Sequence, residues 1–403
     1  TTEIYTLSLH DALPIFSGRR VFMRVDFNVP LDKERRVKDD LRIRAIVPSV
    51  EKVLNGGGKL VLASHLGRPK GKVNEEFSLK PVADYLAGLL KVPVTLSPDC
   101  VGEAVTNLVN GLRQGDVLLL ENLRFHPEEE KNDEGFSRQL AALADVYVND
   151  AFAVSHRAHA SVHGITRFVG TCVAGYPLLK EVQYFNQSMV EPKRPLAMVI
   201  GGAKVSTKIE LLENLIQKAD CLLIGGAMAN TFFKAKGMSV GKSLVEDDFV
   251  ETAASLLAKA GDRGVKVYLP VDAVISPGLD ATGDVRQVSV DAVPADMQIL
   301  DVGTGTTELF QSVLTSCKTV VWNGPLGVFE KQPFHKGTFA MAEFLGGLDA
   351  LTVIGGGDSA AAVRQAGMAD KVSYVSTGGG AFLEMLEGKT LPGVAALEAC
   401  GSK

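Results

Sequence analysis

The stretch that decides the fold reads AMVIGGAKVSTK and covers residues 197–208. A continuous apolar run ends in two glycines, and a helical pattern follows. Continuous apolar runs are typical of parallel strands covered on both faces, and strands that alternate with helices form βαβ units. Similar runs recur at 21–25, 60–63, 117–120, 146–148, 221–224, 265–269, 319–322, 351–354 and 371–376. The pattern predicts an α/β protein whose sheets are mainly parallel, with helices on both faces.

Chain length and one charged, proline-containing segment divide this pattern into two Rossmann-like domains joined by a hinge. The 403 residues exceed what one hydrophobic core usually supports. Two prolines lie in EPKRP, residues 191–195, directly after a helical pattern. We expect an N-terminal domain at 16–176, an interdomain helix and linker at 177–195, and a C-terminal domain at 196–389. Residues 1–15 do not continue into the first strand, and we interpret them as a non-native leader.

Composition excludes several classes of protein. The formal net charge of −5 and the pI of about 5.9 argue against a nucleic-acid-binding protein, whose charge would be basic. No apolar run approaches the roughly 18 residues that span a bilayer, so no membrane association is expected. The five cysteines form no CxxC pair, which favours reduced thiols and a cytoplasmic location over a disulfide framework. The histidines at 126, 159, 163 and 335 have no spacing typical of metal ligands.

The residues that follow the strands differ between the two halves. Ligands of open α/β sheets bind at the carboxyl ends of strands. In the first half these ends carry basic side chains: Arg24, His65, Arg68, Arg124 and Arg157, with Arg42 nearby in the sequence. A single strand-end arginine is more often a surface residue, but several in one crevice would need an anion beside them. Arginine binds phosphate and carboxylate in bidentate geometry, which indicates a small, multiply anionic ligand. Asp26 and Asn28 are placed to bond a hydroxyl group or to orient an arginine.

In the second half the strand ends carry glycine. Glycine allows a close backbone approach, and a helix N-terminus offers N–H groups to phosphate, so the repeated pattern favours a nucleotide site. Lys204 and Lys208 are predicted at i and i+4 on one helix face, where they are either solvated or bound to phosphate. Asp358 is either a helix cap or a Mg²⁺ ligand, and we favour the metal. Glu330 is a candidate for a ribose hydroxyl. Two anion sites on two domains indicate phosphoryl transfer between them.

At this point the ordered motifs indicate a family. They are RVDFNVP (24–30), SHLGRP (64–69), LENLRF (120–125), NDAF (149–152), HRAH (156–159), GGAKV (201–205), WNGP (322–325), GGGD (355–358) and STGGG (376–380). From about Gly18 to the C-terminus the chain resembles phosphoglycerate kinase. Two other readings stay open: a nonenzymatic hinged binding protein for a small phosphorylated acid, and a nicotinamide dehydrogenase. The lack of a complete GxGxxG after any strand argues against the dehydrogenase.

The resemblance implies reversible phosphoryl transfer between ATP and 3-phosphoglycerate, with Mg²⁺, in a monomer that closes about its hinge. The catalytic residues it implies are Arg42, Lys204 and Gly357. The phosphoglycerate-binding residues would be Arg24, Asp26, Asn28, Arg42, His65, Arg68, Arg124 and Arg157. The nucleotide-binding residues would be Gly202, Lys204, Lys208, Gly225, Gly226, Asn323, Glu330, Gly356, Gly357, Asp358 and Ser359, with Asp358 holding the metal.

The resemblance also implies that the C-terminal residues 390–403 return to the N-terminal domain. Two departures from the family's pattern bear on the second site. The sequence GTG at 303–305 stands where the family often has Gly-Pro, which leaves the shape of the nearby loop open. Ser359 stands where the family usually has threonine, which keeps the hydroxyl group.

Overall fold

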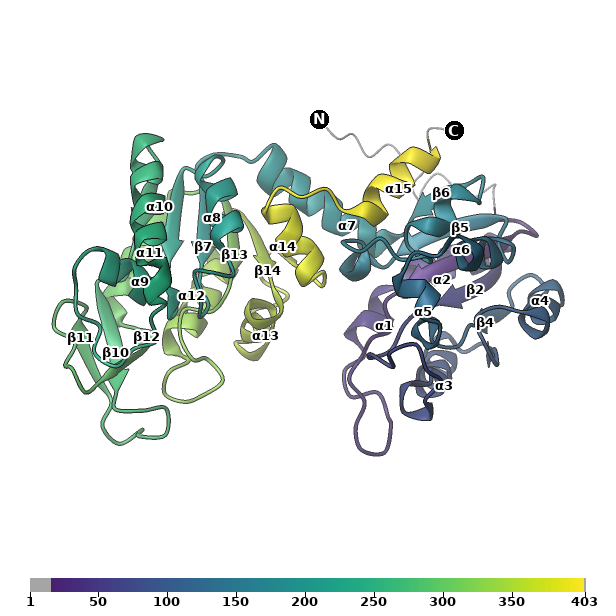
Figure 1. Cartoon of the computed structure of the whole chain (residues 1–403), viewed down its shortest axis with the longest axis horizontal. Helices are drawn as coiled ribbons and strands as arrows, with labels where there is room; N and C mark the ends of the chain where they lie inside the picture. Colours follow the sequence, from purple (N-terminus) through teal and green to yellow (C-terminus); the bar gives the residue numbers. More distant parts are fainter. Residues whose placement is uncertain (1–15, 402–403) are drawn as a thin grey trace. The chain divides into compact units, whose positions relative to one another are not determined.

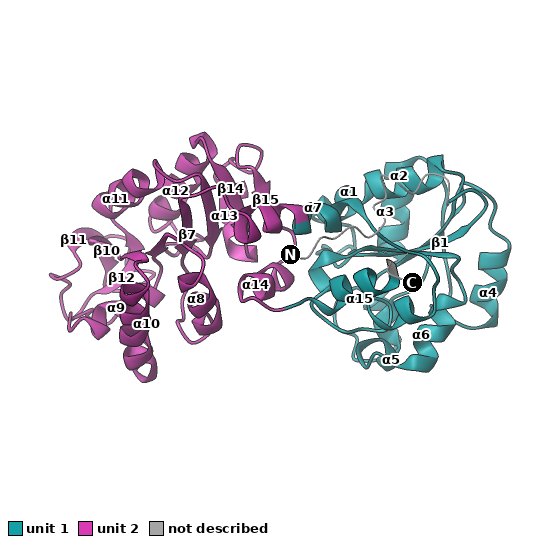
Figure 2. Cartoon of the chain, turned by 90° about the horizontal axis from the view of Figure 1, so that it is seen from above, with its two compact units in different colours: residues 1–182, 390–403 teal, residues 183–389 magenta. Residues whose placement is uncertain are grey.

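The computed structural model describes residues 16–401 (Figure 1). The interpretation of residues 1–15 as a leader therefore concerns residues outside the described part of the chain. The chain forms two compact units, which Figure 2 shows in different colours. Unit 1 comprises the described residues up to Val182 together with those from Thr390 onward, and unit 2 comprises Gln183–Lys389. The boundary at Val182 falls inside helix α7 (Tyr176–Phe185).

Unit 1 is built on a six-stranded sheet in which all strands are parallel, in the order β3-β4-β2-β1-β5-β6. The strands are β1 (Arg20–Val25), β2 (Lys59–Ala63), β3 (Val94–Leu96), β4 (Val117–Leu119), β5 (Val146–Asp150) and β6 (Cys172–Ala174). The helices are α1 (Leu41–Ala45), α2 (Val47–Asn55), α3 (Lys80–Leu90), α4 (Glu103–Asn110), α5 (Pro127–Glu130), α6 (Glu134–Ala141) and α15 (Pro392–Gly401). Short 3₁₀ segments include η2 (Glu75–Phe77), η3 (Leu123–Phe125), η4 (Phe152–Val154) and η5 (Gly164–Arg167).

The central position of β1 explains its continuous apolar run. Val21, Phe22, Met23 and Val25 are fully buried, so consecutive side chains that point to opposite faces all lie in core. Both neighbours, β2 and β5, pair with β1 in parallel. The carboxyl ends of these three central strands therefore lie at one edge of the sheet, where the predicted basic residues follow them.

Unit 2 contains a second six-stranded parallel sheet, in the order β15-β14-β13-β7-β8-β9. Its strands are β7 (Leu196–Ile200), β8 (Cys221–Ile224), β9 (Lys266–Tyr268), β13 (Thr319–Asn323), β14 (Leu351–Gly355) and β15 (Tyr374–Val375). Its helices are α8 (Ile209–Ile216), α9 (Met228–Ala235), α10 (Val250–Asp262), α11 (Thr304–Leu314), α12 (Lys336–Gly347), α13 (Gly357–Gln365) and α14 (Gly380–Leu386); η6 (Asn186–Val190) and η7 (Asp247–Phe249) are shorter turns. The predicted α/β class with two mainly parallel sheets is confirmed.

Two features of unit 2 differ from the sequence prediction. A three-stranded antiparallel sheet, in the order β11-β10-β12, was not predicted; its strands are β10 (Asp272–Ser276), β11 (Arg286–Ser289) and β12 (Gln298–Val302). The strand predicted at 371–376 is wrong in length, because only Tyr374–Val375 is a strand. The backbone N–H groups of Lys371 and Val372 both donate to the carbonyl of Met368, which holds this part of the segment in a turn.

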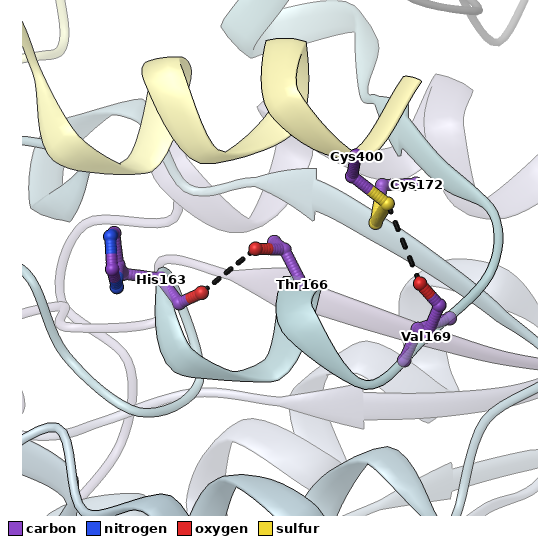
Figure 3. Close-up of a disulfide and its surroundings, with 5 residues drawn as sticks. All are labelled: His163, Thr166, Val169, Cys172 and Cys400. Atoms are coloured by element: carbon purple, nitrogen blue, oxygen red, sulfur yellow. Dashed lines mark hydrogen bonds between the residues drawn. A yellow bond between two sulfur atoms is a disulfide. The ribbon is translucent and has the colours of Figure 1, made fainter. Parts of the chain in front are cut away.

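Helix α15 packs within unit 1, against β6 and η5. A disulfide joins Cys172 of β6 to Cys400 of α15 across 228 residues of sequence (Figure 3). The expectation of reduced thiols is wrong for this pair, because the fold brings a strand and the C-terminal helix together where no local spacing could show it. Cys100, Cys221 and Cys317 are free and buried. Among the described helices, none has both the length and the apolar character needed to cross a membrane.

Candidate active site

The first cluster of candidate residues surrounds Arg24 at the carboxyl end of β1. The Arg24 side chain is fully buried, and its Nε donates to Ser161 Oγ at 2.9 Å while Nη2 lies 3.2 Å from His65 Nδ1. Ser161 in turn donates through Oγ to Glu129 Oε1 at 2.6 Å and through its backbone N–H to Oε2 at 2.9 Å. The buried Glu129 carboxylate thus compensates the Arg24 charge through Ser161.

Asp26, Asn28 and Arg42 form a second part of this cluster. The Arg42 Nη1 lies 3.0 Å from Asp26 Oδ2 and donates to the Asn28 carbonyl at 2.9 Å. The Asn28 side chain accepts from the Gly67 N–H at 2.9 Å, which links the loops after β1 and β2. These contacts show that Asp26 and Asn28 orient Arg42 and the neighbouring loop.

Arg124 lies in η3, where its Nη1 donates to the Gly67 carbonyl at 3.0 Å and its Nε lies 3.2 Å from Glu130 Oε1. The carboxylates of Asp26, Glu129 and Glu130 therefore compensate part of the positive charge of the predicted basic residues. The sequence alone indicated a bound anion as the only compensation for this charge. Arg157 is exposed and donates to His156 Nε2 at 3.2 Å. Arg68 is also exposed, and among the described residues its guanidinium has no hydrogen-bond or ion-pair partner.

The charges of several arginines act on two histidines of the cluster. Burial, followed by the charges of Arg24, Arg124, His159 and Arg42, holds the pKa of His65 well below its ordinary value. Burial, followed by the charges of Arg24, Arg124, Arg157 and His156, lowers the pKa of His159 to about 3. Both imidazoles are therefore neutral near pH 7, and the guanidinium groups supply the positive charge of the cluster.

Three glycine-containing loops meet at the carboxyl ends of β7, β8 and β13 in unit 2. The N–H groups of Gly201 and Gly202 donate to the carbonyls of Asn323 and Pro325, and the N–H of Gly226 donates to that of Leu326. Neighbouring loops thus accept from these glycine N–H groups, so N–H donors to phosphate in unit 2 are expected at the helix N-termini instead. The glycines are needed for close packing instead: a Cβ on Gly226 would lie 2.5 Å from the Gly202 carbonyl oxygen.

Lys204 and Lys208 do not share a helix face, contrary to the prediction, because α8 begins at Ile209. Lys204 is exposed in the loop that precedes the helix. The Lys208 Nζ is directed back into the loops and donates to the Gly201 carbonyl and to Asn323 Oδ1, both at 2.7 Å. Burial lowers the pKa of Lys208 to about 8, although the Asp358 charge opposes this shift.

Helix α13 begins at Gly357, the last glycine of the GGGD motif. Gly356 has φ of +92°, which suits glycine, and no side chain caps the first turn of the helix. Asp358 lies in that turn and is exposed, so its carboxylate does not act as a cap and fits a Mg²⁺ ligand. The Ser359 Oγ is buried and accepts from the Gly324 N–H at 2.6 Å, which joins α13 to the β13 loop.

A cavity of about 230 Å³ lies between these loops and the antiparallel sheet. Of the predicted nucleotide residues, Gly202, Gly226, Glu330 and Asp358 line it. The others are outside its lining: Lys204, Lys208, Gly225 and Gly356 in loops, Asn323 at the end of β13, and Gly357 and Ser359 at the start of α13. Sequence reasoning missed the lining residues Asn230, Phe233, Ile299 and Asp301. Burial raises the pKa of Asp301 to about 7.

Two α/β units, one with clustered arginines at its strand ends and the other with a cavity among glycine loops, define an enzyme of the phosphotransferase class. A family model described as phosphoglycerate kinase matches residues 10–389. The chain belongs to the phosphoglycerate kinase family.

Similarity to individual members extends over nearly the whole chain. A phosphoglycerate kinase of Syntrophobacter fumaroxidans is 71% identical over 384 residues, which cover 95% of this chain and 97% of that protein. One from Chlorobaculum tepidum is 54% identical, with 94% and 96% covered. The solved structure of phosphoglycerate kinase from Coxiella burnetii is 38% identical with a TM-score of 0.89, covering 98% of this chain and 99% of that chain. The structure from Pyrococcus horikoshii is 30% identical with a TM-score of 0.85, covering 99% and 100%.

Proposed function

We propose that this chain catalyses the reversible transfer of a phosphoryl group between ATP and the carboxylate of 3-phosphoglycerate. The observation that supports it most is the cluster of Arg24, Arg42 and Arg124 around two neutral histidines in unit 1. Such a cluster suits a small substrate that carries both a carboxylate and a phosphate. Membership of the phosphoglycerate kinase family supports the same reaction.

In this proposal the two substrates bind to different units. Phosphoglycerate binds through Arg24, Asp26, Asn28, Arg42, His65, Arg68, Arg124 and Arg157. The nucleotide binds in the cavity of unit 2, with its phosphates near Lys208, Asn323 and the start of α13, its ribose near Glu330 and its base near Gly225 and Gly226. Closure about the hinge brings the substrates into line for direct transfer and excludes water, which would otherwise hydrolyse the nucleotide.

The reaction needs charge stabilisation rather than a general base, because the acceptor carboxylate is already ionised. During transfer, negative charge on the phosphoryl group is met by Arg42 from unit 1, and by Lys204 and the Gly357 N–H from unit 2. Asp358 would hold Mg²⁺, which neutralises phosphate charge when it is bound. The proposal also includes a monomeric state and a cytoplasmic location. Membership of the family supports the proposal as a whole.

Formation of ADP in the presence of ATP, 3-phosphoglycerate and Mg²⁺ tests this function directly. We expect turnover that requires all three components, and we expect the Arg42→Met variant to lose most of it. Arg36→Met is the matched control, because Arg36 is an exposed arginine of the same unit that pairs with Asp32 outside the cluster. Binding of both ligands without turnover would instead identify a hinged binding protein and contradict the proposal.

A further inference from the structure

A second group of chemically reactive side chains lies in unit 1, where two loops meet. Asp99 and Cys100 belong to the segment between β3 and α4, and His126 lies between η3 and α5. One carboxylate oxygen, the thiol sulfur and one imidazole nitrogen of these residues all lie within 4.8 Å of one another. The sequence separates Cys100 from His126 by 25 residues without a second cysteine nearby, so no ordinary metal motif indicates the cluster.

Local contacts hold the three donor atoms in place. The Asp99 Oδ1 accepts from the Cys100 backbone N–H and lies 2.6 Å from His126 Nε2. The Cys100 Sγ donates to the Glu121 carbonyl at 2.9 Å. The His126 ring stacks on Phe136, with the ring centroids 5.1 Å apart. The donors are thus oriented by packing and backbone contacts, as ligands of a metal site must be.

The side chains of the three residues differ in their exposure to solvent. The Cys100 side chain is buried, whereas the His126 side chain is 26% exposed and that of Asp99 is 48% exposed. The carboxylates of Asp99, Glu129 and Glu121 lie near enough to the Cys100 thiol for their charges to act on it. The same carboxylates produce a negative field at the sulfur, and a cation bound there would be attracted by it.

We propose that Asp99, Cys100 and His126 form a site for Zn²⁺ or a similar borderline divalent cation. Thiolate, imidazole and carboxylate are the ligand types of zinc, whereas Mg²⁺ and Ca²⁺ prefer oxygen ligands alone. Binding replaces the Cys100 S–H proton, which leaves to solvent. It breaks both the Cys100–Glu121 and the His126–Asp99 hydrogen bonds. Three protein ligands leave the fourth tetrahedral position, on the exposed side, to water.

The site lies close enough to a predicted substrate residue to affect it. His126 follows Arg124 by two residues, and the Arg124 guanidinium pairs with Glu130 of the adjoining helix α5. A cation on His126 restrains the junction between η3 and α5, which His126 alone forms. If the proposed function holds, metal binding changes the KM for 3-phosphoglycerate more than the KM for ATP.

Titration of the metal-free protein with Co²⁺ tests the site without relying on kinase activity. Thiolate ligation of Co²⁺ gives a charge-transfer absorption, and tetrahedral geometry gives strong visible bands. We expect one equivalent to bind and Zn²⁺ to displace it. The Cys100→Ser variant should lose the charge-transfer band, and Asp99→Asn and His126→Gln should each weaken binding by roughly tenfold or more.

The other buried thiols provide the control. Cys221 and Cys317 lie in unit 2 and are also free, so a Cys221→Ser/Cys317→Ser double variant should keep the band. The proposal is overturned if the wild-type protein shows no charge-transfer band. It is also overturned if the band is lost in the Cys221→Ser/Cys317→Ser variant but persists in Cys100→Ser. The Asp99 and His126 variants decide the matter if Cys100→Ser does not fold. A kinase assay run in parallel separates failure of the metal site from failure of the proposed function.

Discussion

The close packing of the glycine loops in unit 2 can be tested by adding a single methyl group. Gly226 has φ of +67°, and a Cβ there would lie 2.5 Å from the Gly202 carbonyl oxygen and 2.8 Å from that of Pro325. Gly367 is the matched control in the same unit, because its φ is +70° and, apart from its two chain neighbours, no described residue has an atom within 4 Å of the position that a Cβ would take. Both alanine variants adopt an unfavourable left-handed backbone, at a cost of about 1–2 kcal/mol.

Only Gly226→Ala adds an overlap with backbone atoms, which cannot move aside as a flexible side chain would. Overpacking of this kind adds about 1–3 kcal/mol. We therefore expect Gly226→Ala to lower the free energy of unfolding by about 2–5 kcal/mol and Gly367→Ala by about 1–2 kcal/mol. Because Gly226 also lines the cavity, its variant should raise the KM for ATP while the control leaves it unchanged.

Denaturant unfolding followed by tryptophan fluorescence measures this difference in unit 2 alone. Trp322 is the only tryptophan of the chain, and it is fully buried in β13. A signal from one unit avoids treating the two units as one cooperative transition. Equal losses of stability in the two variants, with equal KM values for ATP, would refute the argument that backbone contact requires glycine at 226.

Three further predictions concern charge and covalent linkage. Lys208 has a pKa of about 8, which bound phosphates would raise, so nucleotide binding at pH 8–9 should take up a proton and its affinity should fall as pH rises. Calorimetry in buffers of different ionisation enthalpy measures this proton uptake. If no proton is taken up, Lys208 does not contact the phosphates. In steady-state kinetics, Lys204→Ala should lower kcat far more than it raises the KM for either substrate. A variant with a raised KM and an unchanged kcat would exclude action of Lys204 on the moving phosphoryl group. Cys400→Ser should lower the free energy of unfolding of unit 1 by roughly 2–5 kcal/mol, measured by thermal unfolding, and Cys172→Ser should lower it equally. The double variant should lose no more than either single variant. A loss twice as large would show that the two cysteines do not act as a pair.

The α/β class could be predicted because its signal is local. The continuous apolar run of β1, for example, requires burial on both faces whatever the rest of the chain does. Strand β11 gave no such signal, since three of its four residues are exposed and its pairing with β10 depends on the tertiary fold. The bond between Cys172 and Cys400 joins residues 228 positions apart, and no spacing rule reaches so far.

The candidate site shows the same limit. Strand-end arginines are recognisable from their position, and the shifted pKa values of His65 and His159 show Arg24, Arg42, Arg124 and Arg157 acting on a common region. Glu129 belongs to a charged segment that looks ordinary in the sequence. Its carboxylate is buried and accepts from Ser161, which lies 32 residues away, so no local pattern indicates this contact. The roles of individual residues toward each substrate stay predictions.

Binding of each substrate alone to two matched variants tests the central claim, that phosphoglycerate binds to unit 1 and the nucleotide to unit 2. Calorimetry should show that Arg42→Met loses affinity for 3-phosphoglycerate and keeps its affinity for ATP. Lys208→Met should show the reverse. If either variant loses both affinities equally while remaining folded, or if the two losses are exchanged, the assignment of one substrate to each unit is wrong.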